Sequence, residues 1–219
     1  MKTNYIRQLL IFNPDDFKNL EISIVGCGSV GSFTALALAK MGMKKFALWD
    51  FDKVKKHNLP NQFYMEKHLN TSKVESLIDL INSFTSEVKL KTKGKLTNKS
   101  IILSDIVILT TDTMASRKLA YEKSKLLSRY LIDARMGGQI MVIYTVDLKN
   151  PEQVKNYEKT LHTDEEAEDI KCTEKSIIYN VLGISSMICN QLKKQLNKED
   201  YSFMLSLDYH NLILLKNDN

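Results

Sequence analysis

The chain has 219 residues, of which 43% are hydrophobic and 26% are charged, and its formal net charge is +5. This length fits one α/β domain, and the apolar fraction is sufficient for a sizeable core. Acidic residues are interleaved with basic ones along almost the whole chain. The composition therefore predicts a mildly basic solvated surface and no nucleic-acid partner.

The cysteine count and the N-terminal residues indicate in which compartment the protein is expected. Cys27, Cys172 and Cys189 are too few and too scattered for a disulfide framework, and they contain no C-x-x-C pair. A zinc site made of four cysteines from this chain is therefore excluded. The first residues lack an apolar signal core, and no run approaches the roughly 18 apolar residues of a transmembrane helix. We expect a cytoplasmic protein that does not associate with membranes.

Strand and helix patterns alternate along the chain. The predicted strands are 22–25, 46–49, 106–110, 130–134 and 139–147, and the predicted helices are 30–41, 73–84, 115–127 and 176–196. A closing hairpin is expected from 203–207 and 212–215. This order predicts a Rossmann-like, doubly wound α/β fold, with a mainly parallel sheet and antiparallel strands at its C-terminal end.

Residues 150–175 interrupt the pattern. They contain an acidic cluster at 164–169 and little apolar periodicity. Loops of this length inside a compact domain are usually lids or segments without regular structure. We expect a long crossover loop over the active site, or a surface insertion, within a single domain spanning 1–219.

A glycine-rich loop follows the first predicted strand and opens the first predicted helix. Gly26, Gly28 and Gly31 form a G-x-G-x-x-G motif, whose glycines permit a tight turn and a close approach of the backbone to phosphate. The helix N-terminus adds free N–H groups and a dipole that favour anions. Asp50 follows about 20 residues later, where an acid that binds ribose hydroxyls belongs. NAD-dependent oxidoreductases share these features, so the motif predicts a nucleotide but not its kind.

Five segments in order resemble the ThiF/MoeB adenylyltransferase family, relatives of the ubiquitin-activating enzymes. The longest is D-F-D-K-V-K-K-H-N-L-P-N-Q-F at 50–63, which is similar to the family's D-x-D-x-V leading into S-N-L-x-R-Q. Each segment alone is unspecific, but their order and spacing extend over nearly the whole chain. The others are Y-I-R-Q-L-L at 5–10, K-V-E-S at 73–76, T-T-D-T at 110–113 and R-M-G-G-Q-I at 135–140.

This resemblance implies a homodimer that binds ATP and Mg²⁺ and adenylates a carboxylate. The implied substrate is a ubiquitin-like or sulfur-carrier protein that ends in Gly-Gly. Adenylation attacks the α-phosphate and expels pyrophosphate, so it needs cations, N–H donors and a metal site where charge develops. By resemblance, Asp50 holds the ribose, Asn58 contacts the nucleotide, and Asp52, Asn61 and Gln62 belong to the same binding stretch.

Three further residues receive roles from the resemblance. Lys73 would lie against the triphosphate, Asp112 would face the reacting phosphate and hold Mg²⁺, and Arg7 would reach the phosphates across a dimer interface. Each also has a structural interpretation. Lys73 could be a solvated residue at a helix start, Asp112 could cap the helix that begins near 115, Arg7 could be a surface arginine, and Asn58 could serve only a turn.

One position departs from the family pattern. Asn61 stands where N-L-x-R-Q has arginine, so a neutral amide replaces a permanent cation that would face phosphates. Arg117, Arg135 and Lys53 are candidates to supply the missing charge. If none does, the chemistry is slower or different.

Cys172 precedes the last predicted helix, where some family members form a thioester or persulfide after adenylation. Lys171, Lys175 and a helix N-terminus would favour its thiolate. Alternatively, Cys172 is a loop cysteine that packs or lines the nucleotide site. Cys189 lies on the apolar face of the last helix and is expected in the core.

Four functions remain open at this point. The first is adenylation of a carrier-protein C-terminus, and the second is adenylation of a peptide C-terminus or of another carboxylate, such as a modified nucleoside on tRNA. The third is a non-catalytic nucleotide-binding adaptor, which Asn61 makes credible. The fourth is an NAD-dependent oxidoreductase, which leaves Lys73, Asp112 and the 58–62 segment without a role.

Overall fold

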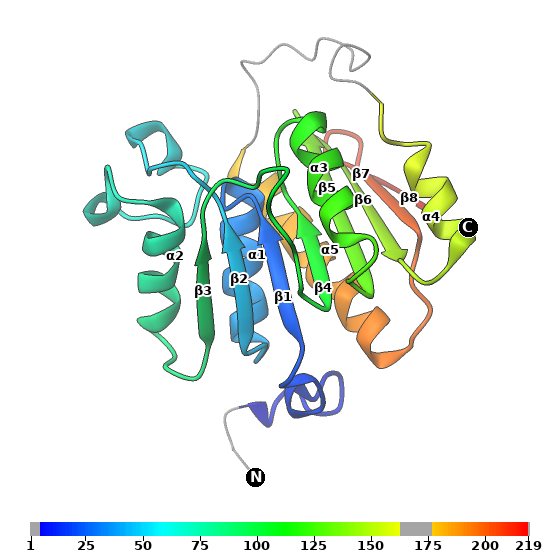
Figure 1. The fold of residues 1–219 in the computed structure, drawn as a ribbon, viewed down its shortest axis with the longest axis horizontal. Helices are drawn as coiled ribbons and strands as arrows, with labels where there is room; N and C mark the ends of the chain where they lie inside the picture. The colour runs from blue at the N-terminus through cyan, green and yellow to red at the C-terminus, as the bar shows by residue number, and fades with distance from the viewer. Residues whose placement is uncertain (1–4, 163–176, 219) are drawn as a thin grey trace.

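The computed structural model describes residues 5–162 and 177–218, which form one mixed sheet flanked by helices (Figure 1). In the described residues the sheet has eight strands in the order β3-β2-β1-β4-β5-β6-β7-β8. The strands are β1 Glu21–Val25, β2 Lys45–Trp49, β3 Lys89–Lys93, β4 Ile106–Leu109, β5 Tyr130–Gly137, β6 Ile140–Asp147, β7 Met204–Asp208 and β8 Ile213–Asn217.

Strand directions divide the sheet into two parts. Strands β1 to β5 pair in parallel, and β1 lies between β2 and β4. From β5 to β8, each strand pairs antiparallel with the next one. The predicted doubly wound α/β fold is therefore confirmed, including its antiparallel C-terminal strands. The order reverses between β1 and β4, the point where open sheets of this kind bind ligands.

Helices cover both faces of the sheet, with α1, α2 and α5 behind it and α3 and α4 in front of it as drawn (Figure 1). None of the helices in residues 5–162 and 177–218 combines the length and the apolar content that a membrane span requires. The α-helices are α1 Ser29–Lys40, α2 Lys73–Asn82, α3 Met114–Ser124, α4 Pro151–Glu158 and α5 Ile178–Asn197; short 3₁₀ helices are η2 Pro14–Phe17, η3 Lys56–Asn58 and η4 Glu66–His68.

The core lies on both faces of the central strands, because successive side chains of a strand point to opposite sides. In β4, Ile106 and Ile108 join a cluster with residues of α1, α2 and α5. Val107 and Leu109 join a second cluster that contains residues of α3 and α4. All four are fully buried. This explains why the central strands appear in the sequence as uninterrupted apolar runs.

The prediction of a continuous loop over 150–175 is wrong for its first part, because α4 occupies residues 151–158. Asn150 is its N-cap and accepts hydrogen bonds from the backbone N–H groups of Glu152 and Gln153, while Pro151 stands at the first helical position. Tyr157 is the buried residue that fastens the helix to the front of the sheet. The acidic cluster at 164–169 lies outside the described residues.

Edge strand β3 was missed in the sequence, because K-L-K-T-K lacks the apolar content of a typical strand. Its lysines at 89, 91 and 93 are exposed, and lysines are common on edge strands because they discourage pairing with another chain. The opposite edge differs. Strand β8 carries exposed apolar residues, Ile213, Leu214 and Leu215.

A buried polar contact stabilises the front of the sheet next to the only tryptophan of the chain. The Nε1 of Trp49 donates to the Oγ of Ser23 at 3.2 Å, and this hydroxyl lies 2.8 Å from the Oγ of Ser104. Both serines are 1% exposed. The contact satisfies an indole N–H group that would otherwise be buried without an acceptor.

Ser23→Ala is expected to lower the free energy of unfolding by about 1–3 kcal/mol, because the buried Trp49 N–H loses its acceptor. Ser186→Ala is the matched control: this exposed serine of α5 can become alanine with no loss of packing. Urea unfolding followed by Trp49 fluorescence measures both. Equal midpoints for the two variants would contradict the assigned contact.

Candidate functional site

The glycine-rich loop turns tightly between β1 and α1. Gly26 has a φ of 95°, and a Cβ there would lie 2.7 Å from the carbonyl oxygen of Thr110. A Cβ on Gly31 would overlap the carbonyl oxygen of Gly26. The Oγ1 of Thr110 donates to this same carbonyl oxygen at 2.6 Å. Two of the three motif glycines are therefore required by close backbone packing.

Gly28 has a different environment, because a Cβ built on it would meet no atom within 4 Å. It is the N-cap of α1, and no side chain caps this helix. The first N–H groups of α1 thus face an open space, and the helix dipole favours an anion there. This combination fits a phosphate group, which supports the prediction for Gly28.

Asp50 stands at the carboxyl end of β2 and joins the loop to the next turn. Its Oδ2 accepts the backbone N–H of Cys27 at 2.8 Å, and its Oδ1 accepts that of Asp52 at 2.8 Å. These bonds fix the carboxylate beside the phosphate loop. A carboxylate oxygen has more than one acceptor direction, so Asp50 keeps capacity for a ribose hydroxyl.

Asp52 and Lys73 form an ion pair close to Asp50. The Nζ of Lys73 lies 2.9 Å from Oδ2 of Asp52, and the Lys73 backbone N–H donates to the Asp52 carbonyl at 2.9 Å. The Lys73 side chain is 9% exposed, so it is not a freely solvated residue at the start of α2. The structure brings both predicted residues together at the start of α2.

The polar segment 58–64 packs on the start of α1. The backbone N–H of Phe63 donates to the Oγ of Ser32 at 3.0 Å, and the hydroxyl of Tyr64 donates to the carbonyl of Cys27 at 2.6 Å. Burial raises the pKa of Tyr64, so its hydroxyl stays a donor. The role of Tyr64 was not predicted, because a buried tyrosine that anchors a loop has no local pattern in the sequence.

Asn58 and Gln62 have distinct environments in this segment, and Asn61 lies between them in the sequence. Asn58 is buried, its Oδ1 accepts the Lys55 backbone N–H at 2.8 Å, and its carbonyl accepts the N–H of Gln62 at 2.9 Å. Asn58 therefore has at least the structural role of holding the turn. Among the described residues, no hydrogen-bond partner reaches the buried Oε1 of Gln62.

Asp112 follows β4 and is exposed at the same edge of the sheet. It does not cap α3, because Thr113 is the N-cap and its hydroxyl accepts the Ser116 backbone N–H. In the part of the chain that the structure describes, no group of three or more histidine, cysteine or acidic residues could hold a metal by itself. One carboxylate together with nucleotide phosphates is nevertheless a usual environment for Mg²⁺.

Arg7 lies far from the phosphate loop of its own chain. It is exposed in the N-terminal segment, which passes below the amino ends of the strands, whereas the loop lies at their carboxyl ends (Figure 1). The side chain of Gln8 anchors this segment by donating to the carbonyl of Met41 at 2.7 Å, at the far end of α1. The structure therefore does not bring Arg7 to the phosphate loop of its own chain.

Two of the three cysteines lie within the described residues. Cys27 and Cys189 are buried. Burial and, second, the charge of Asp50 raise the pKa of Cys27, while burial raises that of Cys189 to about 12. Neither is a nucleophile at neutral pH. Cys172 lies outside the described residues.

The two arginines that were candidates to replace the family arginine are bound within the protein. Arg117 pairs with Asp133 and donates to the carbonyl of Thr111 at 2.6 Å. Arg135 donates to Oδ2 of Asp133 at 2.9 Å. Lys53 is exposed and forms a backbone bridge with Ser72.

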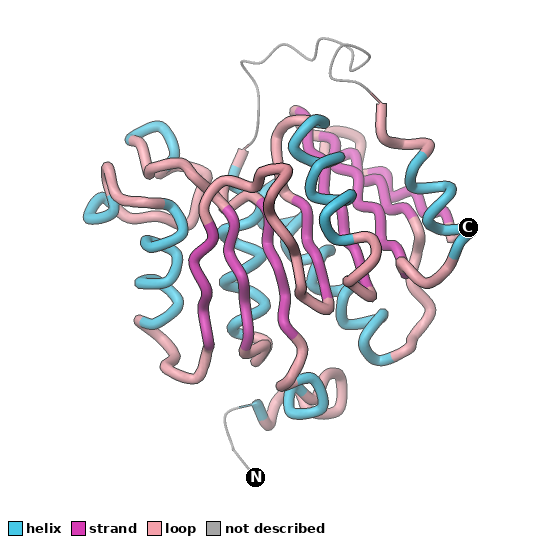
Figure 2. The backbone as a smooth tube through the Cα atoms, viewed as in Figure 1, coloured by secondary structure: helices cyan, strands magenta, loops and turns pink. Residues whose placement is uncertain are grey.

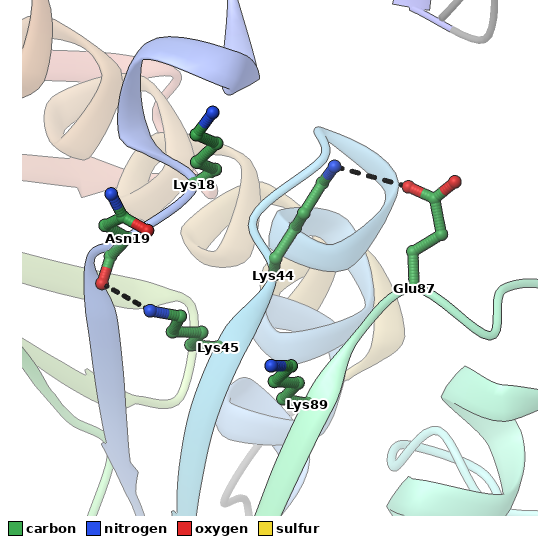
Figure 3. A pocket seen from close by; sticks show the side chains of 6 residues that line it. All are labelled: Lys18, Asn19, Lys44, Lys45, Glu87 and Lys89. Atoms are coloured by element: carbon green, nitrogen blue, oxygen red, sulfur yellow. Dashed lines mark hydrogen bonds and ion pairs between the residues drawn. The ribbon is translucent and has the colours of Figure 1, made fainter.

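A shallow basic pocket of about 250 Å³ lies at the opposite end of the sheet (Figure 3). It contains none of the predicted site residues. Lys44 points toward Glu87 at 3.3 Å, and Lys45 donates to the carbonyl of Asn19 at 3.1 Å. Lys18 and Lys89 complete its lining. The predicted site residues of the β1, β2 and β4 loops lie instead at the carboxyl edge of the sheet, where these loops meet (Figure 2).

Fold and site together define a Rossmann-like α/β protein with a glycine-rich phosphate loop at the switch point of the sheet. Residues 5–215 match the ThiF family model, and the chain belongs to the ThiF family. The resemblance found in the sequence is thus confirmed.

Curated relatives match only part of the chain. A ubiquitin-like modifier-activating enzyme 5 from Drosophila persimilis is 31% identical over 87 residues, which are 40% of this chain and 23% of that protein. An adenylyltransferase and sulfurtransferase MOCS3 from Aedes aegypti is 29% identical over 134 residues, 57% of this chain and 31% of that protein. The matched regions are thus less than a third of the relatives' lengths.

Solved structures agree with the fold over the full chain. A structure of E. coli MccB with ATP has a TM-score of 0.78 at 16% identity, covering 100% of this chain and 72% of MccB. A structure of PaaA has a TM-score of 0.78 at 17% identity, covering 98% of this chain and 72% of PaaA. At these identities the likeness establishes the fold.

Alanine substitutions at two loop glycines are expected to affect different properties, namely stability for Gly31 and ATP binding for Gly28. Gly31→Ala forces a Cβ onto the Gly26 carbonyl and should destabilise the protein by about 2 kcal/mol or more. Gly28→Ala has open space and should cost at most about 1 kcal/mol, yet it should abolish ATP binding because its methyl group enters the phosphate space. Urea unfolding and ATP titration measure the two effects. Unchanged ATP affinity in Gly28→Ala would refute the phosphate position.

Proposed function

We propose that this chain is an ATP-dependent adenylyltransferase that acts as one adenylation domain over 1–219. Its proposed substrate is the C-terminal carboxylate of a ubiquitin-like or sulfur-carrier protein ending in Gly-Gly. The observation that carries the proposal is the meeting of the phosphate loop, segment 58–64 and the Asp112 turn at one edge of the sheet. Membership of the ThiF family and the likeness to MOCS3 and to modifier-activating enzyme 5 support it.

The proposed reaction is a displacement at the α-phosphorus of ATP. A carboxylate oxygen of the substrate attacks, the bond to the bridging oxygen breaks, and pyrophosphate leaves with that electron pair. Negative charge then has to be balanced on both phosphate fragments. The N–H groups at the start of α1, which no side chain caps, and the ammonium group of Lys73, which Asp52 holds in place, are the donors that we assign to this charge.

Asp50 and Lys73 have complementary proposed roles. Asp50 accepts two backbone N–H groups, so its carboxylate is preorganised to accept a ribose hydroxyl. The ion pair with Asp52 orients the Lys73 ammonium group, and the Lys73 side chain is nearly buried. Asn58, Asn61 and Gln62 would complete the wall of the nucleotide site.

Asp112 is the residue that we propose to hold Mg²⁺. Its carboxylate is exposed at the end of β4 and is not used as a helix cap. Mg²⁺ would neutralise phosphate charge and orient the leaving group. Because a single carboxylate holds Mg²⁺ weakly, metal binding should depend on bound nucleotide.

The proposal includes a homodimer and a later transfer to Cys172. A dimer is supported by Arg7, because the adjacent Gln8 is bonded to Met41 at the C-terminal end of α1, whereas the phosphate loop lies at the N-terminal end of that helix. Transfer to Cys172 is supported by the burial and raised pKa of Cys27 and Cys189, which leave Cys172 as the remaining thiol. A carrier adduct that persists in Cys172→Ala would refute the transfer step.

Two alternatives have specific observations behind them. The fold of MccB, solved together with ATP and with MccA, favours a peptide carboxylate as an alternative substrate. Asn61, together with the internal engagement of Arg117 and Arg135, favours a nucleotide-binding adaptor without catalysis. A cytoplasmic location and the lack of a nucleic-acid partner stay predictions from composition.

ATP–pyrophosphate exchange tests the proposal directly. Exchange is expected only when a Gly-Gly carrier protein is present, and Asp112→Asn should reduce it by about 10²–10³-fold. Exchange that requires a peptide instead would support the alternative substrate. ATP binding without exchange for either substrate would identify an adaptor, and binding of NADH without ATP would reject all three.

Mixing two inactive variants tests the dimer. Arg7→Ala and Asp112→Asn should each lack exchange activity, because each disables every site in its own homodimer. Random mixing forms heterodimers that contain one intact site, so about a quarter of wild-type activity should return. Arg129→Ala, at an exposed position, is the control and should retain activity alone. A mixture that stays inactive would refute donation of Arg7 across the interface.

A further inference from the structure

A buried ionic network centred on Asp133 reaches the turn that carries the proposed metal residue, Asp112. Asp133 is fully buried in β5, and Arg117 of α3, which is 5% exposed, pairs with its Oδ1. Its Oδ2 accepts from the Nε of Arg135 at 2.9 Å and from the hydroxyl of Tyr157 at 3.1 Å. Two guanidinium groups and one carboxylate therefore meet in a mostly buried space, and among the described residues of this network one positive charge is in excess.

The outer ends of this network hold two separate segments. On one side, Nη2 of Arg117 donates to the carbonyl of Thr111 at 2.6 Å, immediately before Asp112. On the other side, Arg135 donates to the carbonyl and the hydroxyl of Thr160 at 3.0 and 2.8 Å, just after α4. Asp133 thus connects the β4–α3 turn with the end of α4.

Stability alone does not account for this arrangement. Desolvation of a buried ion pair offsets much of its Coulomb attraction, and apolar residues of similar volume often stabilise a core better. The network instead fixes the orientation of the groups around it, because one guanidinium group can bind several acceptors at once. Arg117 uses this fork on Asp133, on Thr111 and on the carbonyl of Ala134 at 3.3 Å.

We propose that Arg117 and Asp133 are positioning residues that orient Asp112 toward the nucleotide-bound metal, and that Arg135 extends this control to the end of α4. The proposal rests on the proposed adenylation function. Arg117 fixes the Thr111 carbonyl, which limits the directions available to the next residue. Thr110 anchors the start of this turn through the carbonyl of Gly26, whereas Asp112 is exposed and Thr113 is occupied in capping α3.

The excess positive charge strengthens the case. The network lies at the carboxyl edge of β4 and β5, the same edge as the phosphate loop. A buried charge acts over a longer range than a solvated one, because little water screens it. The network therefore contributes positive potential next to a site in which Asn61 provides none, although neither arginine points to a phosphate.

Arg117→Lys separates positioning from charge. Lysine keeps the positive charge but cannot reproduce the fork that holds Asp133 and two carbonyl groups. The probe is ATP titrated with and without Mg²⁺, followed by Trp49 fluorescence or by equilibrium dialysis. The ratio of the two dissociation constants measures the coupling between ATP and Mg²⁺. Arg117→Lys should reduce this ratio about tenfold, toward its value in Asp112→Asn, with little change in ATP affinity without metal.

Arg129→Lys is the matched control. Arg129 pairs with Asp147 at the opposite end of the same strands and is half-exposed. The identical substitution there should leave the ATP–Mg²⁺ coupling unchanged. If Arg117→Lys does not fold, Tyr157→Phe provides the second test: it removes one donor to Asp133, keeps the ring packed against Tyr121, and should lower the coupling about threefold.

The outcomes distinguish the two proposals. Wild-type protein that does not bind ATP would refute the proposed function itself. Wild-type protein that binds ATP with strong Mg²⁺ coupling, while Arg117→Lys or Tyr157→Phe keeps the same coupling, would overturn the positioning role alone. Lower thermal stability in Arg117→Lys with unchanged coupling would also overturn it, since a purely structural network predicts that result.

Discussion

The close packing of Gly31 on the carbonyl of Gly26 is the constraint on which the rest of the site depends. Because no Cβ fits between them, the start of α1 lies directly against the end of β1, and the first N–H groups of the helix point into the open space at Gly28. Asp50 reaches the same loop through the backbone of Cys27, and Tyr64 closes it from the other side. One contact between two glycines thus determines where three loops converge.

Local sequence patterns were sufficient to predict an element wherever its own residue types determine its structure. The apolar run of β4 and the glycine loop could be read directly, since burial on both faces and a tight turn each require particular residue types. Strand β3 could not, because its pairing with β2 decides its structure while its lysines are exposed. For α4, Asn150 and Pro151 are residue types that favour the start of a helix. The helix was still not predicted, because the polar and acidic residues of this region lack apolar periodicity.

Tertiary contacts explain what remained hidden in the site. Tyr64 gains its role from Cys27, which lies 37 residues away in the sequence. Asp133 gains its role from Arg117 on α3 and Tyr157 on α4. The sequence suggested Asp112 either as a metal residue or as a helix cap, and only the structure gives the cap to Thr113. Likewise, Arg117 and Arg135 looked like substitutes for the family arginine until their partners were visible. Neither arginine is thus a free substitute for the family arginine.

The two edge strands of the sheet differ in how easily a strand of another chain could pair with them. Along β3, each lysine that points outward would have to be desolvated before a foreign strand could align with it, so this edge resists extension. Along β8, Ile213, Leu214 and Leu215 lose no charge hydration when covered, and their backbone is at the free margin of the hairpin. Growth of the sheet by an added strand, whether from a partner or from aggregation, is consequently directed to β8.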